Sequence, residues 1–416
     1  MVFMASIKTK LSVISFLEYA IWGSYLTSMG IFFANRGLGS KVGLFFAIQG
    51  FVAFIVPILA GYLADKWLSP LKMFRYSHAI SFAGLLLIGL YALYGGNSFT
   101  VYALLFFVLS AGYIPTLSLY FSLSFQELTS QGLDTVKSFP PIRAWGTVGF
   151  VVSMWIVNLV KSHLTGLFFI QGAFFSALML FSSFMLHDSK STGTDSHTAF
   201  SLAPLKEHSL SVLLLFSFFV GLSLQLSNAY NGPFLDSFAA DAAFKDAFFV
   251  RNSVLLLSVS QISETLVIFL IPFFMNRYSI KGVYAIGIVS WIVHFILLAF
   301  ATPRMPSVLL IILSMLIYGL SFNLYSVATS LYIDKHVPEN IRSSAQGFVL
   351  MFCNGLGGTI GIVACQFVVN SFTESSVVGG VSYLVGNWSA IWLFFAAYMT
   401  IVLLLFLFLY RKKQER

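Results

Sequence analysis

Twelve long apolar runs constrain this chain of 416 residues more than any other feature of its sequence. A helix needs about 20 apolar residues to cross the hydrocarbon core of a bilayer, and each run meets or approaches that length. Hydrophobic residues make up 58% of the chain and charged residues 9%, whereas about a quarter of the residues of a soluble domain are charged. We therefore predict an all-α polytopic membrane protein. The runs cover residues 11–34, 42–64, 76–95, 99–124, 142–160, 164–186, 209–232, 250–275, 282–301, 306–333, 343–371 and 387–410.

The longest polar segment of the chain, residues 187–208, separates the first six runs from the last six. Two groups of six helices are the layout of the major facilitator fold, whose halves are related by an axis along the membrane normal. We predict an N-terminal half at residues 1–186, a cytoplasmic linker at 187–208 and a C-terminal half at 209–416. Because one chain supplies both halves, a monomer is expected.

Lysine and arginine residues gather on one side of the predicted membrane. With the N-terminus placed inside, most of them fall in segments that are also inside, which is the arrangement that bacterial membrane proteins prefer. Both termini are therefore predicted to be cytoplasmic. The net charge of +8 follows from this topology and requires no nucleic-acid partner.

The sequence lacks the usual signatures of an enzyme, namely zinc-ligand spacing, a nucleophile elbow and a phosphate loop. Cys353 and Cys365 lie in one apolar run without metal-ligand companions, so both are expected to be small buried residues. The glycine-rich string NGLGGTIG at 354–361 lies in the same run, where small residues permit close helix packing. We predict no enzyme activity, no metal and no cofactor.

The string SVSQISETLVIFLIPFF, residues 258–274, places an amide and a carboxyl in otherwise apolar sequence. Gln261 and Glu264 are three residues apart and share one face of a helix. A carboxylate in mid-membrane costs about 2.5 to 3.5 kcal/mol on insertion scales, which favours a cavity that takes up a proton or a substrate. The alternative is an acid held neutral by a neighbour where two helices pack.

The string VGLSLQLSNAYNGPF in the seventh run places Gln225 and Asn228 on one helical face at the same spacing. Amide side chains both donate and accept hydrogen bonds, which suits a neutral substrate with hydroxyls and ring nitrogens. One isolated Asn would more simply bond a neighbouring helix. Four polar groups on two adjacent runs favour a binding site.

The fifth run begins with FPPIRAWGTVGF. Pro140 and Pro141 are expected to break or bend the chain. Arg143, Thr147 and Phe150 then follow at helical spacing on roughly one side. Arg143 either snorkels to the membrane surface or places a fixed positive charge near the cavity.

The string GYLADKWLSPLK between the second and third runs resembles the cytoplasmic loop motif of major facilitator proteins. In that motif a close-packing Gly and an Asp at the helix end brace one conformation of the transporter. Gly61, Asp65 and Lys66 match the motif, whereas Leu68 and Ser69 replace its second Gly and its Arg. The match is therefore partial.

Several longer strings closely resemble the nucleoside:proton symporter family of the major facilitator superfamily, in register across essentially the whole chain. They include FLEYAIWGSYLTSMG, FPPIRAWGTVGF, SVSQISETLVIFLIPFFMNRYSIK and MLIYGLSFNLYS. The resemblance implies a symporter of purine and pyrimidine nucleosides in the bacterial inner membrane. It alone selects Phe150 and Phe322 among 46 phenylalanines as residues that stack on the base. It implies substrate-contacting or coupling roles for Arg143, Thr147, Phe150, Gln225, Asn228, Gln261, Glu264 and Phe322.

The chain departs from the family pattern at two positions. Asn323 stands where the family has an Asp after the Phe of the tenth run, and Asn cannot carry a proton. Glu18 stands where the family has Gln. We hypothesise that Glu264 carries the proton with assistance from Glu18, while Asn323 only hydrogen-bonds the substrate. The alternative for Glu18 is an acid near the cytoplasmic end that water reaches.

The expected mechanism is alternating access, in which two halves rock around a site at the midplane. Protonation of Glu264 would remove the charge that opposes closure of a dry cavity. One alternative function is a symporter or facilitator for another small polar solute, such as a sugar. A receptor that binds its ligand without uptake is the alternative from a different class.

Overall fold

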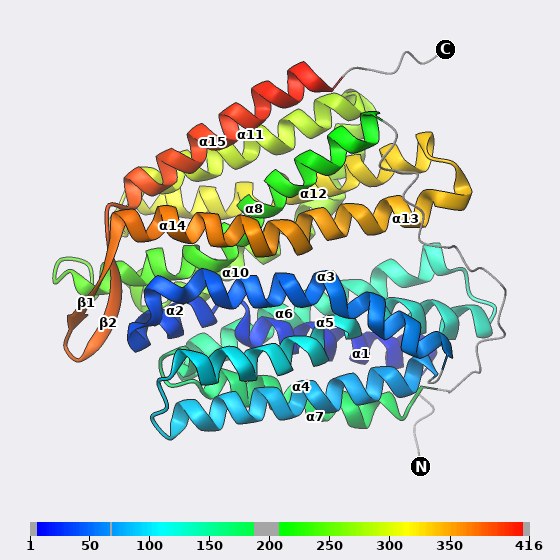
Figure 1. Ribbon diagram of the computed structural model, residues 1–416, viewed down its shortest axis with the longest axis horizontal. Coiled ribbons are helices and arrows are strands. Elements are labelled where there is room, and N and C mark those ends of the chain that lie inside the picture. The colour runs from blue at the N-terminus through cyan, green and yellow to red at the C-terminus, as the bar shows by residue number, and fades with distance from the viewer. Residues whose placement is uncertain (1–5, 67–68, 187–207, 411–416) are drawn as a thin grey trace. The chain divides into compact units, whose positions relative to one another are not determined.

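The computed structural model describes residues 6–66, 69–186 and 208–410, and nearly all of them are helical (Figure 1). The chain divides into two compact units. Unit 1 comprises Met1–Leu38 and Phe51–Thr194, and unit 2 comprises Gly39–Gly50 and Asp195–Arg416. The predicted linker at 187–208 lies, except for its last residue, outside the described residues.

Unit 1 is a bundle in which α1 packs against α6 and α7, while α4 packs against α5 and α7. Short π and 3-10 helical segments lie at Ala34–Leu38 and Ser162–Leu164. The helices of the unit are α1 (Ile7–Tyr25), α2 (Met29–Phe33), the later part of α3 (Val42–Lys66), α4 (Pro70–Leu93), α5 (Phe99–Ser130), α6 (Thr135–Val160) and α7 (Leu167–Ser183).

Glycines bring α1 and α6 into backbone contact. A Cβ added at Gly149 would lie 2.1 Å from the carbonyl oxygen of Phe16, and one added at Gly23 would lie 2.4 Å from that of Phe150. Small residues at membrane helix contacts permit this close approach. The contact fixes the face of α6 that carries the predicted site residues.

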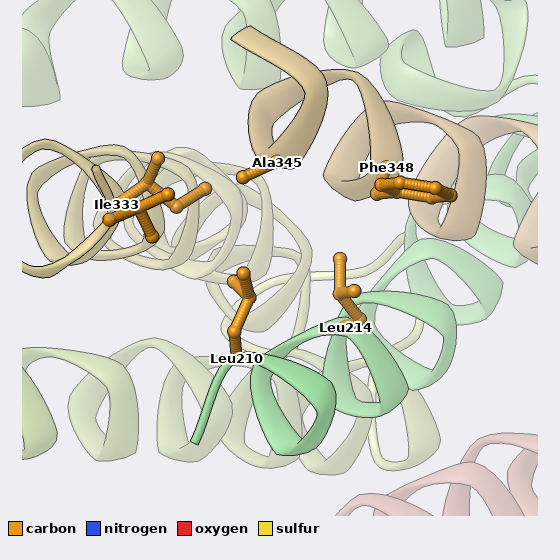
Figure 2. Close-up of a cluster of buried hydrophobic side chains, with 6 residues drawn as sticks. Leu210, Leu214, Ile333, Ala345 and Phe348 are labelled. Atoms are coloured by element: carbon orange, nitrogen blue, oxygen red, sulfur yellow. The ribbon is translucent and has the colours of Figure 1, made fainter. Parts of the chain in front are cut away.

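Unit 2 contains a second set of helices, in which α8 packs against the segment Met351–Gly361, α12 packs against α10 and α11, and α11 packs against α15. Figure 2 shows a buried apolar cluster where α8, α12 and α13 meet, with Leu210, Ile333 and Phe348 among its members. The helices are α8 (His208–Ser237), α9 (Phe248–Arg251), α10 (Ser253–Arg277), α11 (Ile280–Ala299), α12 (Val308–His336), α13 (Glu339–Leu350), the π-helix Met351–Gly361, α14 (Ile362–Phe372) and α15 (Trp388–Leu409).

A two-stranded hairpin joins α14 to α15, in a stretch where the sequence predicted no strand. Strand β1 (Thr373–Val378) pairs antiparallel with β2 (Val381–Gly386), and Val378 is opposite Val381. Gly379 and Gly380 form the turn with φ angles of 60° and 82°. A two-residue turn with positive φ at both positions favours glycine and matches the twist of a hairpin.

The predicted membrane spans correspond to helices of the structure. Among the described residues, ten segments are long and apolar enough to cross a membrane, and α7, with 17 residues, is a shorter apolar helix. The segment Ile7–Val56 has 50 residues, or roughly 75 Å as one helix, and α1 ends within it. This segment therefore contains the first predicted span, 11–34, and most of the second, 42–64.

Of the two effects expected of Pro140 and Pro141, a break or a bend, the break was wrong, because α6 runs without interruption from Thr135 to Val160. The bend stays a prediction. Both prolines lie in the second turn of the helix. Each proline lacks the N–H group that would bond the carbonyl four residues earlier, so α6 forms here without two of its backbone hydrogen bonds.

The glycine-rich run of α13 to α14 packs as predicted. A Cβ at Gly357 would lie 2.9 Å from the backbone of Gly221 in α8, and a Cβ at Gly221 would lie 2.1 Å from the carbonyl oxygen of Cys353. The prediction of close helix packing is confirmed. Cys353 and Cys365 are both buried free cysteines, also as predicted.

Candidate functional site

Three helices of unit 2 carry most of the predicted site residues. Gln225 and Asn228 lie on α8, Gln261 and Glu264 on α10, and Phe322 and Asn323 on α12; all six are partly buried. Helix α12 packs along α10, and a Cβ added at Gly319 would lie 2.4 Å from Oγ of Ser263. The hydroxyl of Ser263 donates to the carbonyl of Leu316.

The Asn323 amide joins α12 to α10. Its Nδ2 group donates to the backbone carbonyl of Glu264 at 2.8 Å and to that of Gly319 at 3.1 Å. An amide nitrogen carries two hydrogens, so backbone acceptors occupy both. The amide nitrogen thus holds two helices together, and Oδ1 is the atom that can face a substrate. A hydrogen bond from Asn323 to the substrate stays a prediction.

Replacing Asn323 with Asp is expected to make the stability of unit 2 depend on pH. A protonated carboxyl can donate one of the two bonds, whereas a carboxylate would face two carbonyl oxygens. We expect thermal stability in detergent to fall as the pH rises from about 5 to about 8, with a loss of roughly 1–3 kcal/mol. Asn323→Ala is the control, since it should be less stable at every pH without this slope. A pH-independent Asn323→Asp protein would contradict the role of the two carbonyls.

Tyr318 positions Asn228, a role that the sequence did not predict. The Tyr318 hydroxyl donates to Asn228 Oδ1 at 3.1 Å, joining α12 to α8. Beside it, the buried His294 of α11 contacts Ser227 Oγ at 3.3 Å through Nε2 and Ser314 Oγ at 2.7 Å through Nδ1. Polar residues in membrane helices often mark functional sites, so Tyr318 and His294 could have been chosen as candidates from the sequence. The sequence does not show which residues they contact.

Gln225 lies beside the π-helical segment of unit 2. A Cβ added at Gly358 would be 3.2 Å from Nε2 of Gln225. The glycine therefore leaves room for the amide group that the sequence singled out.

Arg143, Thr147 and Phe150 lie along α6 in unit 1. The guanidinium carbon of Arg143 is 3.8 Å from the centre of the Tyr19 ring, a cation–π contact with α1. Phe150 is only 5% exposed, and its ring lies edge-on to Trp22 at a centroid distance of 6.2 Å. The structure therefore shows Phe150 as a packing residue, and its stacking on a substrate stays a prediction.

Glu18 is completely buried, so the alternative of an acid that water reaches was wrong. Its Oε1 lies 2.6 Å from Thr116 Oγ1, and its Oε2 lies 3.0 Å from Nε2 of His78. Both side chains of the Glu18–His78 pair are 0% exposed. The sequence did not predict His78, although an isolated His in an apolar run is an uncommon residue in a membrane helix.

The structure says little about the residues of the predicted loop motif. Gly61, Asp65 and Lys66 lie in the last two turns of α3, but their side chains are outside what the structure describes. Across residues 6–66, 69–186 and 208–410, no three His, Cys, Asp or Glu side chains are grouped so that they could hold a metal ion.

Comparison with known proteins gives a consistent relationship over the whole chain. Residues 5–415 match the sequence profile of a family described as "Nucleoside H+ symporter". The nucleoside permease NupG of Escherichia coli is 34% identical over 99% of this chain and 97% of its own, and the xanthosine permease of the same organism is 34% identical over 97% and 96%.

Solved structures show the same relationship in three dimensions. A crystal structure of NupG superimposes with a TM-score of 0.89 at 33% identity, covering 98% of this chain and 100% of the other. A POT family transporter superimposes with a TM-score of 0.72 at 12% identity, which shows the fold alone. The predicted major facilitator fold is confirmed.

Proposed function

The chain belongs to the nucleoside H+ symporter family, and we propose that it carries purine and pyrimidine nucleosides across the bacterial inner membrane together with protons. The observation that supports this most directly is the polar group on α8, α10 and α12, where Asn228, Glu264 and Asn323 interrupt apolar helices. Tyr318 of α12 donates to the Asn228 side chain, and the Asn323 side chain donates to the backbone carbonyl of Glu264. We expect the transporter to be a monomer that works by alternating access.

Amide and carboxyl groups of unit 2 would recognise the nucleoside. Gln225, Asn228 and Gln261 supply donors and acceptors for ribose hydroxyls and the base edge. Phe322 would stack on the base. In unit 1 we assign further substrate contacts to Arg143, Thr147 and Phe150.

The proton would bind Glu264. A neutral carboxyl is compatible with a closed, dry cavity, whereas a carboxylate opposes closure. One proton moving down a potential of 100 mV supplies roughly 2.3 kcal/mol, enough for about 50-fold accumulation of a neutral nucleoside. We assign an assisting role in coupling to Glu18.

Uptake by purified protein in proteoliposomes tests this function. We expect radiolabelled uridine and adenosine to accumulate when an inward proton gradient is applied, and unlabelled nucleosides but not sugars to compete. Equilibration without accumulation would identify a facilitator that lost coupling with Asn323. Binding without uptake would identify a receptor, and competition by sugars alone would overturn the assigned substrate class.

Tyr318→Phe is expected to weaken nucleoside affinity while leaving the maximal rate nearly unchanged. The substitution removes the hydroxyl that holds Asn228 Oδ1, and one hydrogen bond of about 1 kcal/mol corresponds to a roughly fivefold rise in the half-saturating concentration. Tyr94→Phe is the matched control because Tyr94 is 88% exposed. Equal affinities of the two variants would show that Tyr318 does not position Asn228 for binding.

A further inference from the structure

A carboxyl and an imidazole face each other inside unit 1. Glu18 of α1 and His78 of α4 are fully buried, with 3.0 Å between Oε2 and Nε2. Glu18 Oε2 and both ring nitrogens of His78 are buried and make no regular hydrogen bond. The two groups form an ion pair only if His78 is protonated and Glu18 is ionised. The contacts of the other carboxyl oxygen, Oε1, indicate which of the two groups carries the proton.

Thr116 of α5 indicates where the proton lies. Its Oγ1 is 2.6 Å from Glu18 Oε1 and 2.6 Å from the carbonyl oxygen of Tyr113. A hydroxyl has one hydrogen to donate, and a carbonyl oxygen can only accept. If Thr116 donates to Tyr113, its short contact with Glu18 is a hydrogen bond only when the carboxyl donates in turn. A proton on Oε1 therefore satisfies both contacts at once.

We propose that Glu18 and His78 form a second proton-binding pair of the transporter, and that the structure shows it loaded, with the proton on Oε1 of Glu18. The inference rests on the proposed function. When this proton passes to water, Thr116 can turn its hydrogen toward the carboxylate, and Nε2–H of His78 can stabilise the same charge. The site thus has a partner for either protonation state, and no other bond is made or broken.

The surroundings of the pair make it a closed site. Ser176 of α7 donates to the His78 carbonyl at 3.0 Å, and the Phe74 ring lies 4.4 Å from the imidazole. Because both side chains are fully buried, proton exchange with water requires movement among α1, α4 and α5. The titratable and charged groups around Glu18 are Tyr19, Tyr25, Tyr113 and Tyr120, with Arg143 of α6 against Tyr19.

Infrared spectroscopy of the reconstituted protein tests proton binding without requiring transport. We expect a carboxylic-acid band at neutral pH that is absent in Glu18→Gln and shifted in Thr116→Val. Thr116→Ser should retain it, and His78→Gln should shift its frequency, because the imidazole beside Oε2 is removed. A spectrum of Glu18→Gln identical to that of the unsubstituted protein would overturn the proposal, because Glu18 would then be a permanently ionised partner of His78.

Transport measurements test the use of this proton. We expect Glu18→Gln and His78→Gln each to lower gradient-driven uridine accumulation relative to the unsubstituted protein. Exchange of uridine across the membrane without a gradient is measured beside it. Glu127→Gln is the matched control, since Glu127 is a buried carboxyl of the same unit. Normal accumulation by both variants would overturn the proposal. If the unsubstituted protein moves no nucleoside, the proposed function fails and the infrared band alone decides whether the pair binds a proton.

Discussion

Glu264→Gln is expected to abolish proton-driven accumulation while leaving nucleoside exchange. Glutamine keeps the size and the hydrogen-bonding capacity of the side chain but cannot take up a proton. Uridine should therefore fall from about 50-fold accumulation at 100 mV to simple equilibration. The measurement is radiolabelled uridine uptake into proteoliposomes with an inward proton gradient, beside exchange of internal for external uridine without one.

Glu374→Gln is the control for this experiment, because Glu374 lies exposed on strand β1. If Glu264→Gln loses both accumulation and exchange, the carboxyl is needed to bind the nucleoside, and a role in proton coupling is not supported. A Glu264→Gln, Glu18→Gln double variant that accumulates uridine normally would exclude both acids from proton coupling.

Gly221→Ala is expected to destabilise unit 2 strongly. The new Cβ would lie 2.1 Å from the carbonyl oxygen of Cys353. Backbone atoms of two packed helices cannot move apart locally, so the clash should cost about 3 kcal/mol or more despite the higher helix propensity of Ala. Thermal unfolding in detergent measures the loss, and a large part of the protein should fail to reach the folded state.

Gly347→Ala provides the matched control on α13. No atom lies within 4 Å of a Cβ added there, so this substitution should be neutral or stabilise the helix by up to about 1 kcal/mol. Equal stability of the two variants would show that α8 can shift away from the π-helical segment.

The amides and the acid of the candidate site were predictable because they are costly in lipid. Gln225, Asn228, Gln261 and Glu264 stand out in apolar runs at a spacing that places each pair on one helical face. Their partners were not predictable. Tyr318 is 90 residues from Asn228 in the sequence, and Asn323 is 59 residues from Glu264.

Glu18 was likewise predictable as a polar residue, whereas its partners were not. The sequence identified it as an intramembrane acid and left open whether water reaches it. The structure shows that Glu18 is fully buried and that its carboxyl contacts His78 and Thr116. Thr116 is 98 residues from Glu18 in the sequence. Which face of one helix meets which face of another depends on rotation and register, and the pattern of a single helix contains neither.

The sequence by itself determined the apolar membrane spans and the polar residues that need a functional explanation. The physical reason is that hydrocarbon penalises exposed polar groups strongly enough for composition alone to define a span. Only the tertiary structure decided that the Asn323 amide links α12 to α10, that α8 meets the π-helical segment at Gly221, and that Glu18 faces His78. These contacts depend on close packing between segments distant in the chain, which no local pattern encodes.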